Sequence, residues 1–153
     1  MARFFRRGVS KILFLPAVAG ASPTRDEMDD AVALSGSIAD IAGFMLSNSP
    51  IPTPDLDTVF TSQIDGEDTT QDSSLTFNDD NASVVIRTAL AKGTSGFIIL
   101  LPYGDVPTKR LEKWPVKVTG VNDQWSVGND PAKYVVGFAI TSTPLQTGTV
   151  PAA

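Results

Sequence analysis

The stretch from Leu75 to Leu101 constrains the fold most, because it predicts a strand, a short helix and another strand in succession. Its last part, Gly96–Leu101, is an unbroken apolar run that is too short to cross a membrane. A glycine begins this run and Pro102 follows it, which is typical of a strand buried on both faces. We therefore expect residues 96–101 to form the centre of the core.

The helix between these strands is predicted by its capping residues and by one apolar face. Side chains that accept hydrogen bonds from the free N–H groups at a helix start come first: Asp79, Asp80, Asn81 and Ser83. The residues that follow at helical spacing form the apolar face: Val85, Ile86, Ala89 and Leu90. Arg87 is expected to point away from this face. Gly93 is expected to end the helix in the left-handed conformation.

The composition limits the chemistry that the chain can perform. Its 153 residues fit a single domain, residues 1–153, and include no cysteine and no histidine. Disulfides and thiolate chemistry are therefore excluded, a metal would need oxygen ligands only, and the commonest proton shuttle at neutral pH is missing. The sequence also lacks GxxxxGK[ST], GxGxxG, GxSxG and HExxH. We expect no enzyme activity and no cofactor; a hydrolase that uses paired carboxylates is an alternative.

Charge is distributed unevenly along the chain. The net charge is −5, yet five of the twelve basic residues lie within the first 25 positions: Arg3, Arg6, Arg7, Lys11 and Arg25. The rest of the sequence is acidic and has no basic run with interleaved aromatic residues. Tight nucleic-acid binding uses several Lys or Arg contacts to phosphates. We therefore do not expect DNA to be a tightly bound ligand.

The N-terminal segment permits two interpretations. Basic residues precede the apolar run Ile12–Ala19, and its end has the small-x-small pattern of a signal cleavage site, which would indicate a secreted or cell-surface β-sandwich binding module. Pro16 interrupts this short run, however. We favour a first strand at Lys11–Leu15, preceded by an N-terminal arm at residues 1–10. No other segment approaches the length of a membrane span.

The next part of the chain is predicted to hold a helical turn, a strand and a connector. Ser22, followed by proline and then acids, predicts a capped turn that reaches Asp29. Ile38–Leu46 is apolar enough for a strand that faces the core, with a kink at Gly43. Asn48–Pro54 has prolines at alternate positions and is predicted to be an extended connector without regular strand pairing.

Two further strands are predicted to form a hairpin with a long acidic loop. The strands are Val59–Ile64 and Ser73–Phe77, and the loop is residues 65–72. Oxygen-bearing side chains at alternate loop positions raise a calcium site as an alternative. Thr70 stands where a calcium loop has glycine, however, and Thr76 stands where it has a bidentate glutamate. We favour a solvated loop, or a loop that becomes ordered against a partner subunit.

The C-terminal third is predicted to hold two strands and an arm. Arg110–Val121 places Trp114, Val116 and Val118 on one face, and Pro115 predicts a free strand edge or a bulge because it has no N–H. Residues 121–131 are predicted to be a turn-rich bridge with Trp125 in a loop, residues 133–143 an alternating strand, and residues 144–153 a C-terminal arm. The fold class is mainly β: a two-sheet antiparallel β-sandwich or barrel with one short flanking α-helix.

A set of stretches, in order along nearly the whole chain, carries a resemblance to a known family. The stretches are SPTRDE (22–27), IADIAGF (38–44), PDLD (54–57) with VFT (59–61), DSSLTF (72–77), GFII (96–99) with YGD (103–105), WPVKV (114–118) and FAIT (138–141). Together they resemble the major tail protein, or tail tube subunit, of long-tailed, siphovirus-type bacteriophages.

The resemblance implies a structural virion protein that is located in the tail and assembled in the host cytoplasm. Such subunits form hexameric rings, which stack into the hollow tube through which DNA reaches the host. The implied partners are other copies of the chain, a tape-measure protein in the lumen, and tail terminator and distal tail proteins at the tube ends, with DNA only in transit and no membrane. The resemblance brings no catalytic residues. A tail terminator or a tube-like secretion ring protein is a sibling role that it also allows.

A tube subunit needs two distinct self-contacts, one that closes a ring and one that repeats along the axis. Our candidate contact residues are basic residues of the N-terminal arm, acids of the predicted loop and the proline of the predicted free edge: Arg3, Arg6, Arg7, Asp65, Glu67, Asp68, Asp72 and Pro115. We hypothesise that the acidic loop of one subunit meets the N-terminal arginines of another. The net negative charge suits a conduit, because a lumen that bound phosphates would hold back the genome.

Overall fold

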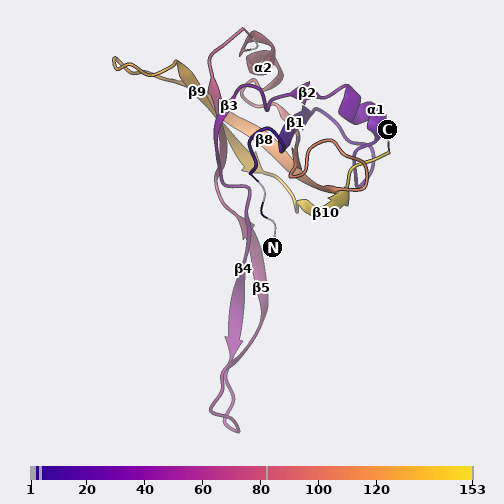
Figure 1. The fold of residues 1–153 in the computed structure, drawn as a ribbon. Coiled ribbons are helices and arrows are strands. Elements are labelled where there is room, and N and C mark those ends of the chain that lie inside the picture. The colour runs from indigo at the N-terminus through magenta and orange to yellow at the C-terminus, as the bar shows by residue number, and fades with distance from the viewer. Residues whose placement is uncertain (1–2, 4, 82, 153) are drawn as a thin grey trace.

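The structure is a computed structural model that describes residues 3, 5–81 and 83–152 (Figure 1). These residues form two helices, α1 (Arg25–Asp29) and α2 (Ser83–Ala89), and ten strands: β1 (Lys11–Leu15), β2 (Val32–Ala33), β3 (Ile38–Ala42), β4 (Leu46–Thr53), β5 (Ser62–Thr70), β6 (Ser73–Asn78), β7 (Ser95–Leu101), β8 (Arg110–Gln124), β9 (Lys133–Ile140) and β10 (Leu145–Thr149). All strand pairs are antiparallel. The prediction of a mainly β, antiparallel fold of two sheets is confirmed.

Eight strands make up the body, and two make up a ribbon that projects from it. The body sheet has the order β2-β1-β7-β8-β9-β6-β3, and β10 also pairs with β8. The ribbon is the hairpin β4–β5, which extends away from the body (Figure 1). The second sheet is therefore not a second layer over the core. We call the segment from Leu46 to Thr70 the arm.

Strand β7 separates two apolar clusters, as the unbroken run at residues 96–101 predicts. Ile98 packs into the larger cluster together with Phe77 and Trp114, whereas Ile99 and Leu101 pack into a smaller cluster on the opposite face. All of these side chains are almost completely buried. The prediction of a central strand buried on both faces is confirmed, and so is the strand at Lys11–Leu15, which pairs with β7.

Helix α2 follows the prediction in its position, but not in its end or in its whole apolar face. Ile86 and Leu90 are buried, as expected. Gly93 has a φ of 89°, but the helix ends at Ala89, so this glycine belongs to a following turn and does not cap the helix. Val85 is exposed, so its place in the buried face was wrong. Arg87 does not simply point to solvent, because its guanidinium lies 4.1 Å from the centre of the Tyr134 ring. The short helix therefore buries a narrow face of about one residue per turn.

Helix α1 is the predicted capped turn, with its start two residues later than expected. The cap is Thr24 rather than Ser22: the Glu27 N–H donates to Thr24 Oγ1 at 3.3 Å, and the Thr24 N–H donates to Glu27 Oε1 at 3.0 Å. This reciprocal pair satisfies N–H groups that a helix start leaves free. Hydrogen bonds to the Glu27 carboxylate, from the Thr24 N–H first and also from the Ala19 N–H, hold the pKa of Glu27 below its usual value.

The chain leaves β3 for the arm through two left-handed residues. Gly43 has a φ of 84° and Phe44 a φ of 58°, which confirms the predicted kink at Gly43. A side chain at position 43 would meet the Asp72 carbonyl oxygen at 2.4 Å, so only glycine fits there. The prediction that residues 38–46 face the core was wrong for most of the segment. Ile41 is half exposed, and the buried residue is Phe44.

The arm overturns two predictions. The stretch 48–54 was predicted to be an unpaired connector, but residues 48–53 belong to β4. The stretch 65–72 was predicted to be a loop, but residues 65–70 belong to β5. The backbone nitrogens of prolines two positions apart face the same edge of a strand. In a two-stranded ribbon one edge of each strand is unpaired, so prolines at alternate positions can face that edge without loss of strand pairing. The hairpin tip is residues 54–61, and β5 pairs with β4, not with β6 as predicted.

Strand β6 instead joins the body sheet beside its end strand, β3. It pairs with β3 on one side and with β9 on the other, so residues 73–78 and 133–138 lie side by side although they are far apart in sequence. The alternation predicted for β9 is confirmed, since Tyr134, Val136 and Phe138 are buried. The bridge predicted at residues 121–131 begins only after Gln124, because β8 continues to that residue. Trp125 lies in the loop between β8 and β9, as predicted, and is 90% exposed.

The C-terminal segment is part of the body rather than an arm. Residues 145–149 form β10, which pairs with β8, and Val150 is buried. Arg25 holds the next residues: its Nη2 donates to the Pro151 carbonyl oxygen at 2.7 Å, while its Nη1 donates to both carboxylate oxygens of Asp105 at 2.9 Å. The prediction of a free tail from residue 144 was wrong. The two prolines and the small number of large apolar residues indicated a tail, but the segment between the prolines still forms a strand.

The predicted N-terminal arm, residues 1–10, lies partly outside the described residues. From Arg6 the chain forms a turn, in which the Ser10 N–H donates to the Arg6 carbonyl oxygen at 2.9 Å. The Ser10 hydroxyl donates to the Pro102 carbonyl oxygen at 2.7 Å, which ties this turn to the body. Neither helix in the described part of the chain is long and apolar enough to span a membrane.

Candidate assembly interface

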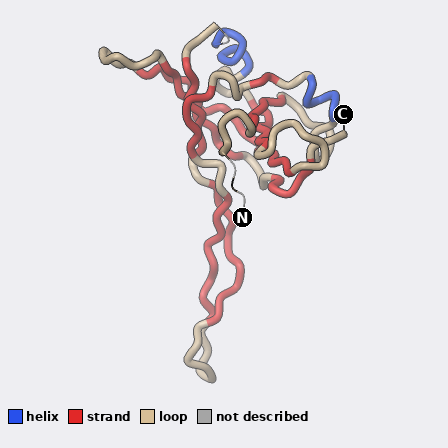
Figure 2. Tube along the Cα trace, viewed as in Figure 1, coloured by secondary structure: helices blue, strands red, loops and turns tan. Residues whose placement is uncertain are grey.

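The arm exposes nearly all of its side chains to solvent. Of the residues in β4 and β5, only Leu46, Thr53, Gly66 and Thr70 are partly covered. The paired strands extend from the body as a separate ribbon (Figure 2). At about 3.3 Å per strand residue, the eight residues of β4 extend roughly 25 Å from the body. A lone two-stranded hairpin is at best marginally stable in water. A long hairpin that packs on nothing of its own therefore points to a surface completed by another chain.

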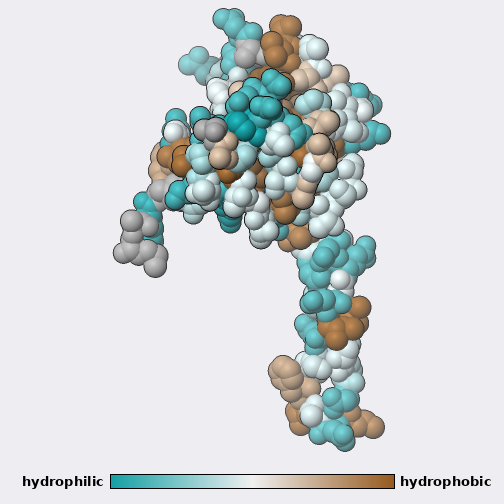
Figure 3. Space-filling view, turned by 90° about the vertical axis from the view of Figure 1, so that its right-hand side faces the viewer, coloured by the Kyte–Doolittle hydropathy of each residue, from teal (hydrophilic) through white to brown (hydrophobic). Residues whose placement is uncertain are grey.

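Apolar side chains gather on this exposed hairpin (Figure 3). Ile51 and Ile64 lie opposite each other across the two strands, and both are more than half exposed. At the tip, Leu56 and Val59 are fully exposed and Phe60 is 79% exposed. Single exposed apolar residues are ordinary, but a cluster at the end of a projection is typical of an interaction site. We call Leu56, Val59 and Phe60 the apolar tip.

All charged residues within the arm and in the sequence on either side of it, from residue 26 to residue 86, are acidic. Between Arg25 and Arg87 the sequence has no basic residue, and six acids lie in residues 46–72: Asp55, Asp57, Asp65, Glu67, Asp68 and Asp72. Of the predicted contact residues, Asp65, Glu67 and Asp68 lie on β5 and Asp72 at the arm root, all exposed. Asp68 also accepts a hydrogen bond from Asn48 Nδ2 at 2.6 Å. The arm is thus an acidic hairpin with an apolar end.

A β-bulge fixes the register of the arm at its middle. Asp65 and Gly66 together oppose Pro50, since Ser49 pairs with Glu67 and Ile51 with Ile64. The Asn48 side chain holds the bulge: its Nδ2 donates to the Gly66 carbonyl oxygen at 3.1 Å, and its Oδ1 accepts from the Gly66 N–H at 3.2 Å. A Cβ at position 66 would lie 1.8 Å from the Ser49 carbonyl oxygen, so glycine is required.

We expect Gly66→Ala to disorder the arm without unfolding the body. The methyl group clashes with β4 backbone, so the strands must separate at the bulge, while the core clusters contain no residue of β4 or β5. Hydrogen exchange should show loss of protection across residues 46–70 and little change in β7 and β8. Gly36→Ala is the matched control, because a Cβ there meets nothing within 4 Å. Retained arm protection in Gly66→Ala would contradict the proposed role of the bulge.

A groove lies between the two ends of the body sheet. Its walls come from the N-terminal turn and β1 on one side and from β3 on the other. Ile12, Ile38 and Ile41 give the groove an apolar lining, while Arg6 and Arg7 give it positive charge. Asp40 is an acid in the same lining, and its Oδ1 accepts a hydrogen bond from the Ile41 N–H. We call this site the arginine groove.

The β8–β9 hairpin forms a second projection with a different character. Trp125 and Val127 are exposed near its end. At its base Arg87 pairs with Asp123 and lies 4.0 Å from Asp79, and its guanidinium covers the Tyr134 ring. The side-chain hydrogen bond with Asp123 contributes most to the raised pKa of Arg87, and burial raises the pKa of Tyr134. The arginine thereby ties α2 to the hairpin.

The structure places the predicted contact residues on different elements. Arg6 and Arg7 lie in the arginine groove, and Arg3 is exposed nearby in sequence. The acids lie on β5 and at the arm root. Pro115 is different: it is buried, and its carbonyl oxygen accepts from the Thr141 N–H at 3.1 Å, where the edge of β8 passes from β9 to β10. The prediction of a free strand edge or a bulge at Pro115 was therefore wrong, since Pro115 pairs with Phe97 of β7 and the bulge of β8 lies between Val118 and Gly120.

The most exposed contact candidates were missed by the sequence reasoning. Leu56, Val59 and Phe60 were predicted to lie before or within a body strand, because the alternating prolines were taken to end the regular structure. One feature of the sequence could have predicted their exposure. These apolar residues lie between acids, in a stretch that has neither helical nor strand periodicity and so predicts no buried face.

Comparison with known proteins identifies the family of the chain that carries these surfaces. A sequence model of a family described as phage tail tube protein matches residues 1–153. The chain belongs to the phage tail tube protein family. The predicted resemblance is therefore confirmed, and with it a structural role as a tail tube subunit of the virion. No curated protein matches the sequence.

Solved structures share the fold of this tail tube protein. A chain of the sixfold-symmetrised anti-feeding prophage baseplate aligns with a TM-score of 0.61 at 6% identity, covering 95% of this chain and 98% of that chain. A chain in the tail of an empty gene transfer agent particle, refined with C6 symmetry, aligns with a TM-score of 0.58 at 11% identity, covering 96% and 100%. A chain in the virion of the native gene transfer agent particle gives 0.51 at 12%, covering 77% and 89%. These identities establish a common fold only.

Proposed function

We propose that this tail tube protein assembles into hexameric rings that stack into a hollow tube, and that this tube conducts DNA into the host. Sixfold symmetry is a property of the baseplate and of the gene transfer agent tail to which the chain is similar. The observation on this chain that carries the proposal is the arm with its exposed apolar tip. In a lone subunit this apolar surface stays exposed to water, whereas in a stack a neighbouring subunit covers it.

The two self-contacts that a stacked tube requires have separate candidates on the surface. Strand β3 ends the body sheet and pairs only with β6 among the described strands, so its other edge offers free N–H and C=O groups for pairing around a ring. The arm extends away from the body and suits a contact between rings. A repeated head-to-tail contact of this kind does not close on itself and so produces a filament.

The charge of the chain supports a conduit for DNA. The net charge is −5, and no basic residue lies between Arg25 and Arg87. A channel lined with acids repels phosphates, so the genome moves through it without being held. The further partners that we propose are a tape-measure protein in the lumen and terminator and distal tail proteins at the tube ends, which would cover the first and last rings.

Electron microscopy of the purified, full-length protein tests this function. We expect rings with six subunits that stack into tubes as concentration rises, and class averages viewed down the axis should show sixfold symmetry and a central channel. Sedimentation in parallel should show large assemblies in place of a species of 16.2 kDa. A protein that remains monomeric at high concentration and shows neither rings nor tubes would overturn the proposal.

A further inference from the structure

We propose that the apolar tip of one subunit docks into the arginine groove of a second copy of this chain. The inference rests on the proposed function and deepens it, because it identifies the binding site for the end of the arm. We call this binding site the seat. The occupant is the segment 54–61, and the seat lies between the N-terminal turn with β1 and the end strand β3.

The tip is organised before it binds. Asp55 Oδ1 accepts hydrogen bonds from the Asp57 N–H at 3.0 Å, the Thr58 N–H at 2.9 Å and the Thr58 hydroxyl at 3.1 Å. These bonds, those from Thr58 first, hold the pKa of Asp55 below its usual value. At the base of the turn, the Thr53 hydroxyl donates to the Ser62 carbonyl oxygen at 3.1 Å. A turn that is already shaped pays less conformational entropy when it docks.

The seat matches the tip in its apolar character. The tip presents Leu56, Val59 and Phe60 to solvent. The groove presents Ile41 and the partly buried Ile38, while Ile12 forms its floor as a buried core residue. Ile41 is 47% exposed, so part of this apolar lining is open to solvent in the subunit. Burial of apolar surface on both sides favours association.

The seat also matches the tip in charge. Asp57 is exposed at the tip, and the carboxylate of Asp55 is committed to the turn, so Asp57 is the acid best placed to meet a partner. Arg6 and Arg7 line the groove against the single acid Asp40. Complementary charges around an apolar contact orient the partners and exclude the wrong register.

Another concave site on the described surface suits an acidic tip less well. It lies at the base of the β8–β9 hairpin and is lined by Asp79, Asp123 and Asp130, with Arg87 and Lys133. Arg87 is already paired with Asp123 and covers the Tyr134 ring. An acidic tip would face three carboxylates there, and like charges brought together at an interface oppose binding.

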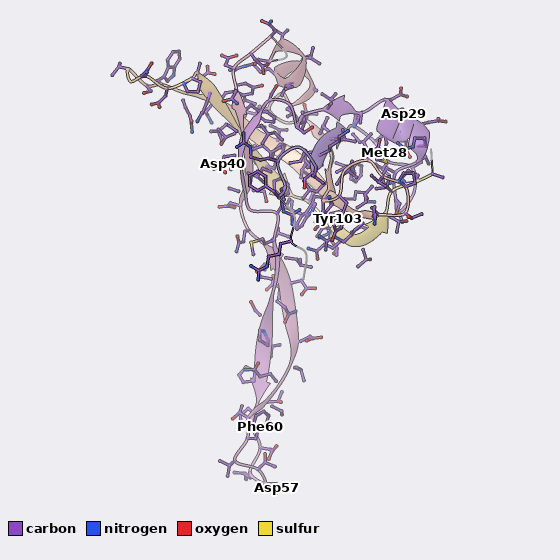
Figure 4. The ribbon with its side chains drawn as sticks, viewed as in Figure 1. Met28, Asp29, Asp40, Asp57, Phe60 and Tyr103 are labelled. Carbon is purple, nitrogen blue, oxygen red and sulfur yellow. The ribbon has the colours of Figure 1, made fainter. Side chains whose placement is uncertain are left out.

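The geometry makes this a contact between copies. The groove lies on the body beside β3, directly before the arm root, whereas Asp57 and Phe60 lie at the far end of the arm and Asp40 lies on the body (Figure 4). With a reach of roughly 25 Å along β4 at about 3.3 Å per residue, the tip cannot fold back onto its own groove while β4 and β5 stay paired. Tip to root is a head-to-tail contact, which repeats along one direction.

Cysteine cross-linking tests the seat directly, because the chain has no cysteine of its own. We expect the double variant Thr61→Cys and Ala39→Cys, treated with a short bismaleimide after assembly, to yield a ladder of covalent oligomers. Both residues are exposed, and Ala39 lines the groove. The matched control pairs Thr61→Cys with Asn129→Cys on the β8–β9 loop and should remain mostly uncrosslinked. A ladder in the control but not in the test pair would overturn the seat.

A charge exchange provides the second measurement. Asp57→Arg or Arg7→Asp alone should raise the protein concentration needed for tube formation about fivefold, the size of one surface charge pair. The combined variant should restore assembly. Tubes that form with no ladder, and with no effect of either charge change, would place the tip elsewhere while the proposed function stands. Absence of rings and tubes in the unchanged protein would instead overturn the proposed function itself.

Discussion

A subunit in which an Asn-Gly turn replaces residues 48–68 is expected to fold and to form no tubes. Ser47 and Thr69 are a paired position of the arm, so a two-residue turn closes the hairpin at its root. The removed residues belong to neither core cluster, and the free energy of unfolding should change by no more than about 1 kcal/mol. Assembly should be lost completely, as judged by electron microscopy at concentrations where the unchanged protein forms tubes.

A smaller change separates the apolar tip from the rest of the arm. We expect the triple variant Leu56→Ser, Val59→Ser and Phe60→Ser to keep the arm and to lose tubes as the deletion does. The control removes exposed apolar side chains elsewhere, with Val84→Ser and Val85→Ser on α2. Tubes formed by the shortened subunit would show that the arm is dispensable. Equal loss in the α2 control would show that any exposed apolar residue matters, not this tip.

The parts of the fold that sequence reasoning predicts are those with a buried face. The run Gly96–Leu101 and the alternation through Tyr134 and Phe138 each meet the core, so hydrophobic periodicity reports them directly. Helix α2 is predicted for the same reason, through Ile86 and Leu90. Val85 was misassigned because two adjacent valines give no periodicity that distinguishes the covered face from the exposed one.

The arm escaped prediction because it has no buried face. Its strands carry polar residues on both sides, so no alternation appears, and Pro50 and Pro52 suggest that pairing is impossible. A two-stranded ribbon accepts them, since one edge of each strand faces solvent. The pairing of β6 with β9 joins residues about sixty positions apart in the sequence. The local pattern of residues 73–78 does not indicate which strand they pair with. Sequence reasoning instead paired β5 with its nearest neighbour.

The candidate interface was predictable in its charges but not in its shape. The concentration of arginines at the N-terminus and of acids after residue 54 is visible in the sequence and led to the hypothesis that the two meet across subunits. That contact stays a prediction. The structure adds that the acids lie on a long hairpin and that the hairpin ends in an apolar tip, which no charge pattern reveals.

Replacing Trp114 with alanine is expected to cost about 3–5 kcal/mol of unfolding free energy, the range for loss of a buried aromatic side chain. Trp114 is fully buried in the larger core cluster and meets the Phe44 ring edge-on, with centroids 5.7 Å apart. Domains of this size are stable by only about 5–15 kcal/mol. Urea unfolding should therefore show a much lower midpoint with an unchanged slope.

This core residue also bears on the direction of the arm. Phe44 has a φ of 58° at the point where the chain leaves β3, and its N–H donates to Ser73 Oγ at 2.9 Å. Trp114→Ala removes the aromatic partner of Phe44, so hydrogen exchange at residues 43–46 should accelerate along with the global loss of stability. The control Trp114→Phe keeps an aromatic ring against Phe44 and removes an indole N–H that has no acceptor among the described residues. Its cost should therefore be clearly smaller. If the two variants lost equal stability, the edge-on contact would not be what holds the arm root against the core.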